Sequence, residues 1–461
     1  MTRFRRRAGL SAARKVAGYT QESLAEALGV DRTTVATWES GEHEPLPHMR
    51  PLLAGVLGVD VAGIDSLINE TDPHLPGSGW GRDVDEQVRR SQEEWLAVRK
   101  APGARGRELT ELAAWLYPES ERAPGGHVLT GPGWLAETPM PLDAVDLEWA
   151  DDSPPHALPA SVALDDLLPR TENGSRYTDY GRAVRDLVRP RLLENRLSYR
   201  LTGITPRADG LGLRFGRTTF FEVFNLKQLV AHEFKRAWLL AGREAPRLDD
   251  LPLRTAIGSP FDPSALLMSP GITTLTIRRG EEATFVLHER DGGKVADGGG
   301  LCHPMPAGEF QPSSAAPADV VNDLSLWRNI MREFSEEFLG NPEHDGGGSR
   351  PIDYGRDEPF RRFEEARAAG GLRLWHLGLV IEPLELGVQQ LTVAVLDAPV
   401  FDRLFAGMVA VNDEGRVVGR DGRHVPFTAE AIRRLDPRLS ASGLTLLHRA
   451  WRARDVLLAH P

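Results

Sequence analysis

Apolar residues near the start of the chain recur at the spacing of short amphipathic helices. The positions that would face inward are Leu24, Ala25, Leu28, Val35 and Trp38. Thr20 can cap the first helix, because its hydroxyl accepts hydrogen bonds from free amides of the first turn. Gly29 can end that helix in a left-handed conformation, and Asp31 can cap a second helix over Arg32–Ser40. The pattern predicts two short helices joined by a turn around residues 29–31.

The outward face of the predicted second helix is polar and suits a DNA groove. Its side chains are Arg32, Thr33, Thr34 and Thr37. In a helix-turn-helix the second helix lies in the major groove, where Arg pairs with guanine and Thr offers a hydroxyl and a methyl. A basic arm with Arg5, Arg6 and Arg7 precedes it and predicts further DNA contacts. The alternatives are a solvated tail for the arm and a helical bundle that contacts only protein.

The order of residues in this region resembles the XRE-type (phage-repressor-like) helix-turn-helix family. The matching positions are Thr20-Gln21, Leu24-Ala25, Leu28-Gly29-Val30, Thr34-Val35, Trp38-Glu39, Gly41 and Pro45. The resemblance implies a DNA-binding domain over residues 1–70. It also implies that Gln21 helps to fix the DNA backbone while the second helix reads bases of double-stranded DNA.

The stretch after this domain is dominated by residues that break regular structure. Residues 72–79 are rich in Pro and Gly and predict a hinge. A helix is expected over residues 83–100, where Val84, Val88, Ser91, Trp95 and Val98 lie near a 3-4 spacing. This seam could join two copies of the chain or pack on the chain's own core. We expect residues 71–169 to form a hinge, helical and irregular connecting region.

Residues 170–461 alternate between strand and helix signals. β-branched and aromatic residues mark strands at 272–278, 283–289, 373–381 and 391–396, and helical periodicity marks 228–240 and 324–339. Single helices between groups of strands predict an α/β (α+β) domain with a mixed or antiparallel sheet. The expected fold class is therefore multidomain, with an all-α N-terminal domain, a helical linker and an α/β C-terminal domain.

Three carboxylates mark the helix expected at residues 324–339. Glu333, Glu336 and Glu337 lie at i, i+3 and i+4, so one helix face would present all three. Oxygen ligands at this density suit Mg²⁺ or Mn²⁺, which commonly also hold a substrate diphosphate. The alternative is a solvated acidic face.

The segment Arg332-Glu333-Phe334-Ser335-Glu336-Glu337 resembles the core of the Nudix box. The proline- and glycine-rich stretch over residues 305–310 is similar to the approach to that box. The resemblance implies a Nudix-like domain in which the three glutamates bind metal and Arg332 orients them. Gly308 and Glu309 would help to hold a ligand.

The chain also differs from the family's spacing. Counted back from Arg332, the family's opening glycine falls at Ala318 and its first glutamate at Leu324. The closing glycine comes one residue late, at Gly340.

Composition limits the class of protein. A length of 461 residues is enough for two or three domains. The net charge of -11 does not favour nucleic acid, but the basic residues gather ahead of Glu22, and distribution matters more than the total. The single cysteine, Cys302, excludes an intramolecular disulfide, and no apolar run reaches the roughly 18 residues of a membrane helix. These features predict a cytoplasmic protein with no membrane partner.

Together the patterns predict a DNA-binding transcription regulator that acts as a homodimer. Its Nudix-like domain would sense a phosphorylated or nucleotide-type small molecule. One alternative is a Mg-dependent Nudix hydrolase of nucleoside diphosphate derivatives with an autoregulatory DNA-binding domain. Another is a protein-interaction scaffold that uses neither site. The pairing of regulator and Nudix-like sensor is an analogy at the level of the fold.

Overall fold

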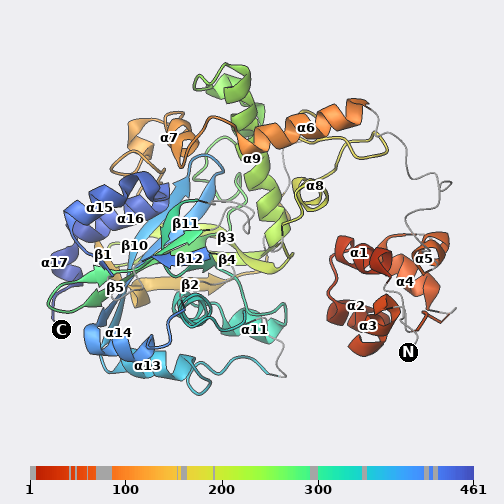
Figure 1. Cartoon of the computed structure of the whole chain (residues 1–461). Helices are drawn as coiled ribbons and strands as arrows, with labels where there is room; N and C mark the ends of the chain where they lie inside the picture. Colours follow the sequence, from red (N-terminus) through yellow and green to blue (C-terminus); the bar gives the residue numbers. More distant parts are fainter. Residues whose placement is uncertain are drawn as a thin grey trace. The chain divides into compact units, whose positions relative to one another are not determined.

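The structure is a computed structural model of the chain (Figure 1). It describes residues 7–40, 43–46, 49–59, 61–68, 86–152, 154–156, 164–190, 193–290, 300–344, 350–409, 415–418 and 424–460. The chain divides into two compact units. The first contains helices α1 to α5, and the second contains the sheets.

The first unit is a bundle of short helices. These are α1 (Ala8–Val16), α2 (Gln21–Leu28), α3 (Arg32–Ser40), α4 (Arg50–Leu57) and α5 (Val61–Ile68). Their buried core contains Leu10, Leu24, Ala25, Leu28, Val35, Trp38, Leu53 and Ile64. The predicted inward positions are therefore confirmed. Because each helix is only two to three turns long, tertiary packing of these faces stabilises it more than helix propensity does.

The ends of α2 follow the predicted capping pattern. The Thr20 hydroxyl accepts a hydrogen bond from Ser23 N at 3.0 Å, and Ser23 Oγ accepts one from Thr20 N at 2.8 Å. This reciprocal pair is a capping box with serine in place of glutamate. Gly29 follows the helix with a φ of +67°, which glycine adopts at little cost. Both ends of α2 are thus fixed by local chemistry.

The second unit is built on a mixed sheet of order β1-β10-β11-β5-β6-β13, with β9 also paired to β5. The strands are β1 (Leu135–Pro141), β5 (Gly271–Arg279), β6 (Thr284–Phe285), β9 (Ala307–Glu309), β10 (Leu372–Glu382), β11 (Gly387–Asp397) and β13 (Val425–Pro426). β11 and β5 are parallel, whereas β10 and β11 form a long antiparallel pair. The predicted mixed α/β character of this half is confirmed.

Helices cover both faces of this sheet (Figure 1). On one face α16 (Ala441–Arg452) packs its apolar residues against Leu275, Leu391 and Val393. On the other lie α12 (Leu326–Glu333), α13 (Phe360–Ala368) and α14 (Ala398–Leu404). α12 continues into a π-helical turn, Phe334–Phe338, where a single α-helix was expected. A π turn holds one more residue than an α turn, so it rotates the side chains that follow it.

Two further sheets and a long helix complete the unit. One sheet has the order β2-β4-β3 and the other β12-β7-β8. Their strands are β2 (Val145–Trp149), β3 (Leu197–Pro206), β4 (Leu211–Thr219), β7 (Leu287–Arg290), β8 (Cys302–Pro304) and β12 (Gly415–Val418). The remaining helices are α6 (Glu86–Lys100), α7 (Glu108–Ala114), α8 (Tyr180–Leu187), α9 (Phe220–Leu240), α10 (Pro252–Ile257), α11 (Pro317–Asn322), α15 (Ala429–Leu435) and α17 (Arg454–Leu457).

The expected connecting region is, from residue 90 onward, part of the second unit. β1 is an edge strand on β10, and β2 pairs in parallel with β4. The sequence did not indicate these strands, because they lie at sheet edges, where prolines and acidic residues are tolerated and the apolar pattern is weak. The hinge expected at residues 72–79 lies outside the described residues. Trp95, in the predicted seam, is buried in the chain's own second unit.

Candidate functional site

The N-terminal half of α3 presents the predicted DNA-reading side chains. Arg32 and Thr33 are exposed, whereas Thr34 and Thr37 are half-buried. The Thr37 hydroxyl donates to the Thr34 carbonyl at 2.9 Å, so part of its bonding capacity is used within the helix. Arg32 and Thr33 are therefore the side chains best placed to reach base edges.

A buried ion pair connects the three helices behind this surface. Arg14, on α1, donates through Nε to Glu39 Oε1 on α3 at 2.6 Å, and Glu39 is only 3% exposed. Gln21, the first residue of α2, donates through Nε2 to Glu39 Oε2 at 2.8 Å. Burial alone would raise the pKa of Glu39, but the hydrogen bonds from Arg14 and Gln21 and the Arg14 charge lower it. One carboxylate thus holds α1, α2 and α3 together.

This arrangement changes the expected role of two residues. Gln21 was expected at the DNA backbone, but one amide hydrogen is committed to Glu39, which leaves the other for a phosphate. Arg7 was expected to contact DNA and is instead a structural residue, because its side chain is only 11% exposed. Its Nε donates to Ile68 O at 2.9 Å and its Nη1 to Trp38 O at 3.0 Å. Arg5 and Arg6 lie outside the described residues.

The three glutamates of the acidic helix do not gather at one point. Glu333 packs against Gly308 of β9, where any side chain would collide with its carboxylate. Glu337 Oε2 accepts from Ala307 N at 3.3 Å, also on β9. Glu336 Oε1 instead accepts from His344 N at 3.0 Å. Glu333 and Glu337 thus both reach β9, whereas Glu336 bonds to the segment at His344, and the π turn over Phe334–Phe338 departs from the α-helical register on which the shared face was predicted.

Glu336 has an altered acidity. Burial raises its pKa to about 7, with a smaller contribution from the charge of Glu343. A carboxyl with this pKa can exchange a proton near neutral pH. Among the residues that the structure describes, no three His, Cys, Asp or Glu side chains are grouped so as to hold a metal ion. Binding of Mg²⁺ or Mn²⁺ by Glu333, Glu336 and Glu337 stays a prediction and requires these side chains to regroup.

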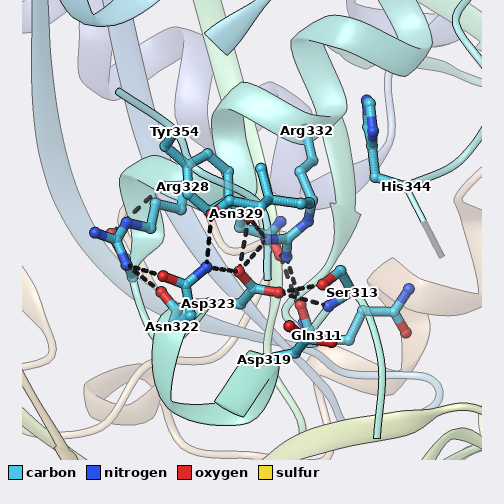
Figure 2. Close-up of polar contacts among 12 residues, drawn as sticks. Gln311, Ser313, Asp319, Asn322, Asp323, Arg328, Asn329, Arg332, His344 and Tyr354 are labelled. Atoms are coloured by element: carbon cyan, nitrogen blue, oxygen red, sulfur yellow. Dashed lines mark hydrogen bonds and ion pairs between the residues drawn. The ribbon is translucent and has the colours of Figure 1, made fainter. Parts of the chain in front are cut away.

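Arg332 belongs to a buried polar network with Asn329, Tyr354 and Asp323 (Figure 2). It is 5% exposed and donates through Nη1 to the Tyr354 hydroxyl at 2.5 Å. Its Nη2 donates to Gln311 O at 2.5 Å and to Asn329 Oδ1 at 3.0 Å. Asp323 lies 3.6 Å from Nη1 and balances the charge. Arg332 was expected to orient the glutamates and touch a ligand; its donors are used in the protein interior instead.

Asp323 is the residue that sequence reasoning missed. It is fully buried and accepts from Ser313 N at 2.8 Å, from Ser313 Oγ at 2.6 Å and from the Tyr354 hydroxyl at 2.8 Å. By the Nudix-box spacing, that family's first glutamate falls at Leu324, one position later. An aspartate adjacent to that position was the available signal.

Gly308 and Glu309, which were expected to hold one ligand, point to opposite faces of β9. Successive residues of a strand point to opposite faces. Gly308 faces Glu333, whereas Glu309 lines a cavity under α9. The expected ligand residues Arg332, Gly308 and Glu309 therefore lie in three different surroundings and do not form one site.

Comparison with known proteins supports the N-terminal assignment. Residues 10–64 match a family model described as Helix-turn-helix, of the XRE type. The XRE-type prediction is confirmed for this region, and with it a DNA-binding transcription regulator as the class of function. None of the curated proteins compared matches the chain. The match ends before residues 170–461, where a Nudix-like domain stays a prediction. No helix within the described ranges is long and apolar enough to cross a membrane.

We predict that Glu39→Gln strongly destabilises the first unit, because it leaves the Arg14 charge buried without a counter-ion. The expected loss in the free energy of unfolding is about 3–5 kcal/mol, read from the unfolding transition of that unit in the full chain.

The pKa of Glu39 is lowered on folding, so the contribution of Glu39 to the free energy of unfolding is present above about pH 4.3. It is lost as the pH falls through the lowered pKa. Glu44→Gln is the control, because Glu44 is 55% exposed and its pairs are worth less than about 1 kcal/mol. Equal effects of the two substitutions would contradict this role.

We predict that Asp323→Ala destabilises the second unit by about 3–5 kcal/mol, because it removes the carboxylate that forms an ion pair with buried Arg332.

 The measurement is the midpoint of that unit's unfolding transition in thermal or denaturant titrations of the full chain. Asp402→Ala is the matched control, because Asp402 is 54% exposed and its pair with Arg278 should contribute less than about 1 kcal/mol. If both substitutions shift the midpoint alike, Asp323 does not have the role assigned to it.

Proposed function

We propose that this protein is a transcription regulator that binds duplex DNA through α3 and responds to a small molecule held by its second unit. The observation that carries the proposal is the helix-turn-helix match over residues 10–64, with Arg32 and Thr33 exposed at the start of α3. Recognition helices meet base edges with residues of their N-terminal half. Such domains bind two half-sites as dimers, so we also propose that the protein acts as a homodimer on its operator.

The proposed effector is a phosphorylated or nucleotide-type molecule, and the proposed sensor is a Nudix-like fold in the second unit. Support comes from the mixed sheet with its parallel β5–β11 pair and from the acidic helix that packs Glu333 on Gly308. The buried Arg332–Asp323 pair places a carboxylate one position before Leu324, where the family has its first glutamate. A Mg-dependent hydrolase is the second candidate, favoured by Glu336, whose pKa burial raises to about 7.

A response to a ligand needs a connection between the sensor and the chain that leads to the DNA-binding domain. α6, which follows that domain in the sequence, is held to α9 by polar contacts. Arg99 Nη1 donates to Gln228 Oε1 at 2.6 Å, and Lys235 Nζ donates to Arg99 O at 3.3 Å. Trp95 stacks on His232 with ring centroids 5.7 Å apart. A ligand that prefers one position of α9 would therefore change the population of α6 positions.

We predict that Arg32→Ala weakens binding to the preferred operator by about tenfold or more, because a bidentate contact to guanine is worth about 1–3 kcal/mol. The probe is a duplex selected by the unmodified protein from a random-sequence library, and binding is measured by fluorescence anisotropy at fixed salt. Arg433→Ala, at an exposed arginine of α15, is the control and should leave binding unchanged. Unchanged affinity of Arg32→Ala would count against α3 as the reading helix.

We predict that a panel of nucleoside diphosphate derivatives raises the unfolding temperature of the full chain, with little or no product formed. Thermal shift and product are measured together, with and without Mg²⁺. Product formation that is lost in Glu336→Gln and Glu337→Gln, but kept in the exposed control Glu365→Gln, would favour the hydrolase. A panel that gives neither a shift nor product would overturn both readings of the second unit.

A further inference from the structure

A small cavity lies under the N-terminal half of α9, where three distant segments of the second unit meet. Tyr199 N of β3 donates to Phe310 O at 3.3 Å, and Phe310 N donates to Pro270 O at 3.2 Å. These bonds bring the start of β3, the segment before β5 and the end of β9 side by side. The cavity between them and α9 has a volume of about 20 Å³.

Two buried hydroxyls border this cavity without a partner. Ser198 is 2% exposed and Ser269 is 5% exposed, and both line the cavity. Within the described part of the chain, neither hydroxyl oxygen has a hydrogen-bond partner. Buried polar groups are almost always hydrogen-bonded, so something that carries donors or acceptors is expected in the cavity.

The charge around the cavity is negative. Glu309 lines it, and the described residues offer its carboxylate no ion-pair partner. Lys227 also lines it, but its ammonium is bound to Glu385 at 3.0 Å. Because Lys227 is already paired with Glu385, Glu309 adds a negative group to the residues that line the cavity. A cation is favoured here and a phosphate is disfavoured.

The remaining walls are apolar. Phe220, Val223 and Phe224 lie on one face of α9 at the cavity, and the two rings stack with centroids 5.5 Å apart. Phe220 is only half-buried, so its ring lies at the border between the cavity and solvent. Aromatic faces attract cations and also bind flat apolar groups.

We propose that this cavity is a binding site for a primary amine with a short apolar or aromatic body. An ammonium head is about the size of a water molecule, which needs roughly 10–15 Å³, so it fits the cavity whereas a phosphate does not. Its three N–H donors match the acceptors that Ser198, Ser269 and Glu309 provide. The body of the amine would lie along Phe220 toward solvent.

This site goes beyond the proposed function, because it uses none of the residues of the acidic helix. Glu309 and Gly308 are neighbours on β9 but point to opposite faces, so the amine site and the surroundings of Glu333 are separate. The site does share α9 with the contacts that hold α6. An amine bound at the start of α9 is therefore placed to affect the same helix.

The test compares three probes that share one ring and differ in charge: benzylamine, benzyl alcohol and benzoate. Binding to the full chain at pH 7 is measured by isothermal titration calorimetry. Benzylamine is expected to bind at least tenfold more tightly than benzyl alcohol, and benzoate is expected not to bind. Glu309→Gln should weaken benzylamine at least tenfold while keeping the shape of the side chain.

The control is Glu281→Gln, an exposed carboxylate just beyond the opposite end of β5 from Ser269, and it should leave benzylamine binding unchanged. Ser198→Ala gives a second variant, expected to weaken benzylamine several-fold. Equal binding of the three probes, no binding of any of them, or unchanged affinity in Glu309→Gln would overturn the amine site; in the second case the cavity holds only water. The nucleotide panel is read separately, so either proposal can fail while the other stands.

Discussion

A carboxylate that is removed from water must be matched by donors, because an unmatched buried charge costs about 3–5 kcal/mol, a large share of the stability of a folded domain. Both units of this protein contain such a carboxylate at the junction of several elements. In the first unit, Glu39 receives donors from Arg14 on α1 and Gln21 on α2. Apolar faces of short helices tolerate many packings of similar energy, whereas a hydrogen-bonded ion pair accepts few. The position of α3 within its domain, and so the direction in which Arg32 points, depends on this pair.

In the second unit, Asp323 is the buried carboxylate that receives donors from several elements. This carboxylate gathers Ser313 from the segment after β9, Tyr354 from the segment before α13, and Arg332 from α12 (Figure 2). Because both terminal nitrogens of Arg332 donate to buried protein groups, the guanidinium holds α12 in place and has little capacity left for a ligand. The same contact that makes the helix rigid therefore limits what its chemistry can be.

Local signals were enough to predict part of this structure from the sequence. α2, α3, their caps and their inward residues follow from spacing and from Thr20 and Gly29, since each depends on a few neighbouring residues. β10 and β11 were visible because central strands are apolar on both faces. The burial of Arg7 and Glu39 was not visible, since charged residues are seldom buried and nothing local marks the exceptions.

The predicted ligand residues of the second unit do not lie together in the structure, for a related reason. A helix drawn through residues 324–339 places Glu333, Glu336 and Glu337 on one face, but the structure has a π turn at Phe334–Phe338, which no local pattern in the sequence indicates. Likewise, Gly308 and Glu309 look like one loop until β9 forms and directs them to opposite faces. Short elements that exist only through their tertiary partners are the ones that pattern analysis cannot place.

α9 is the element that would connect a ligand bound in the second unit to the position of α6. It has 21 residues and so is about 32 Å long, with Phe220 and Phe224 at one end and the contacts to α6 further along. A packed helix moves as a body, so a ligand that prefers one position of its first turns biases the contacts of Arg99 and Trp95 as well. The ligand can shift the equilibrium between the two positions of α9 by no more than the difference in its binding free energy for them. The coupling is also reciprocal, so DNA that favours one position of α6 would change the affinity of the second unit for its ligand by the same factor.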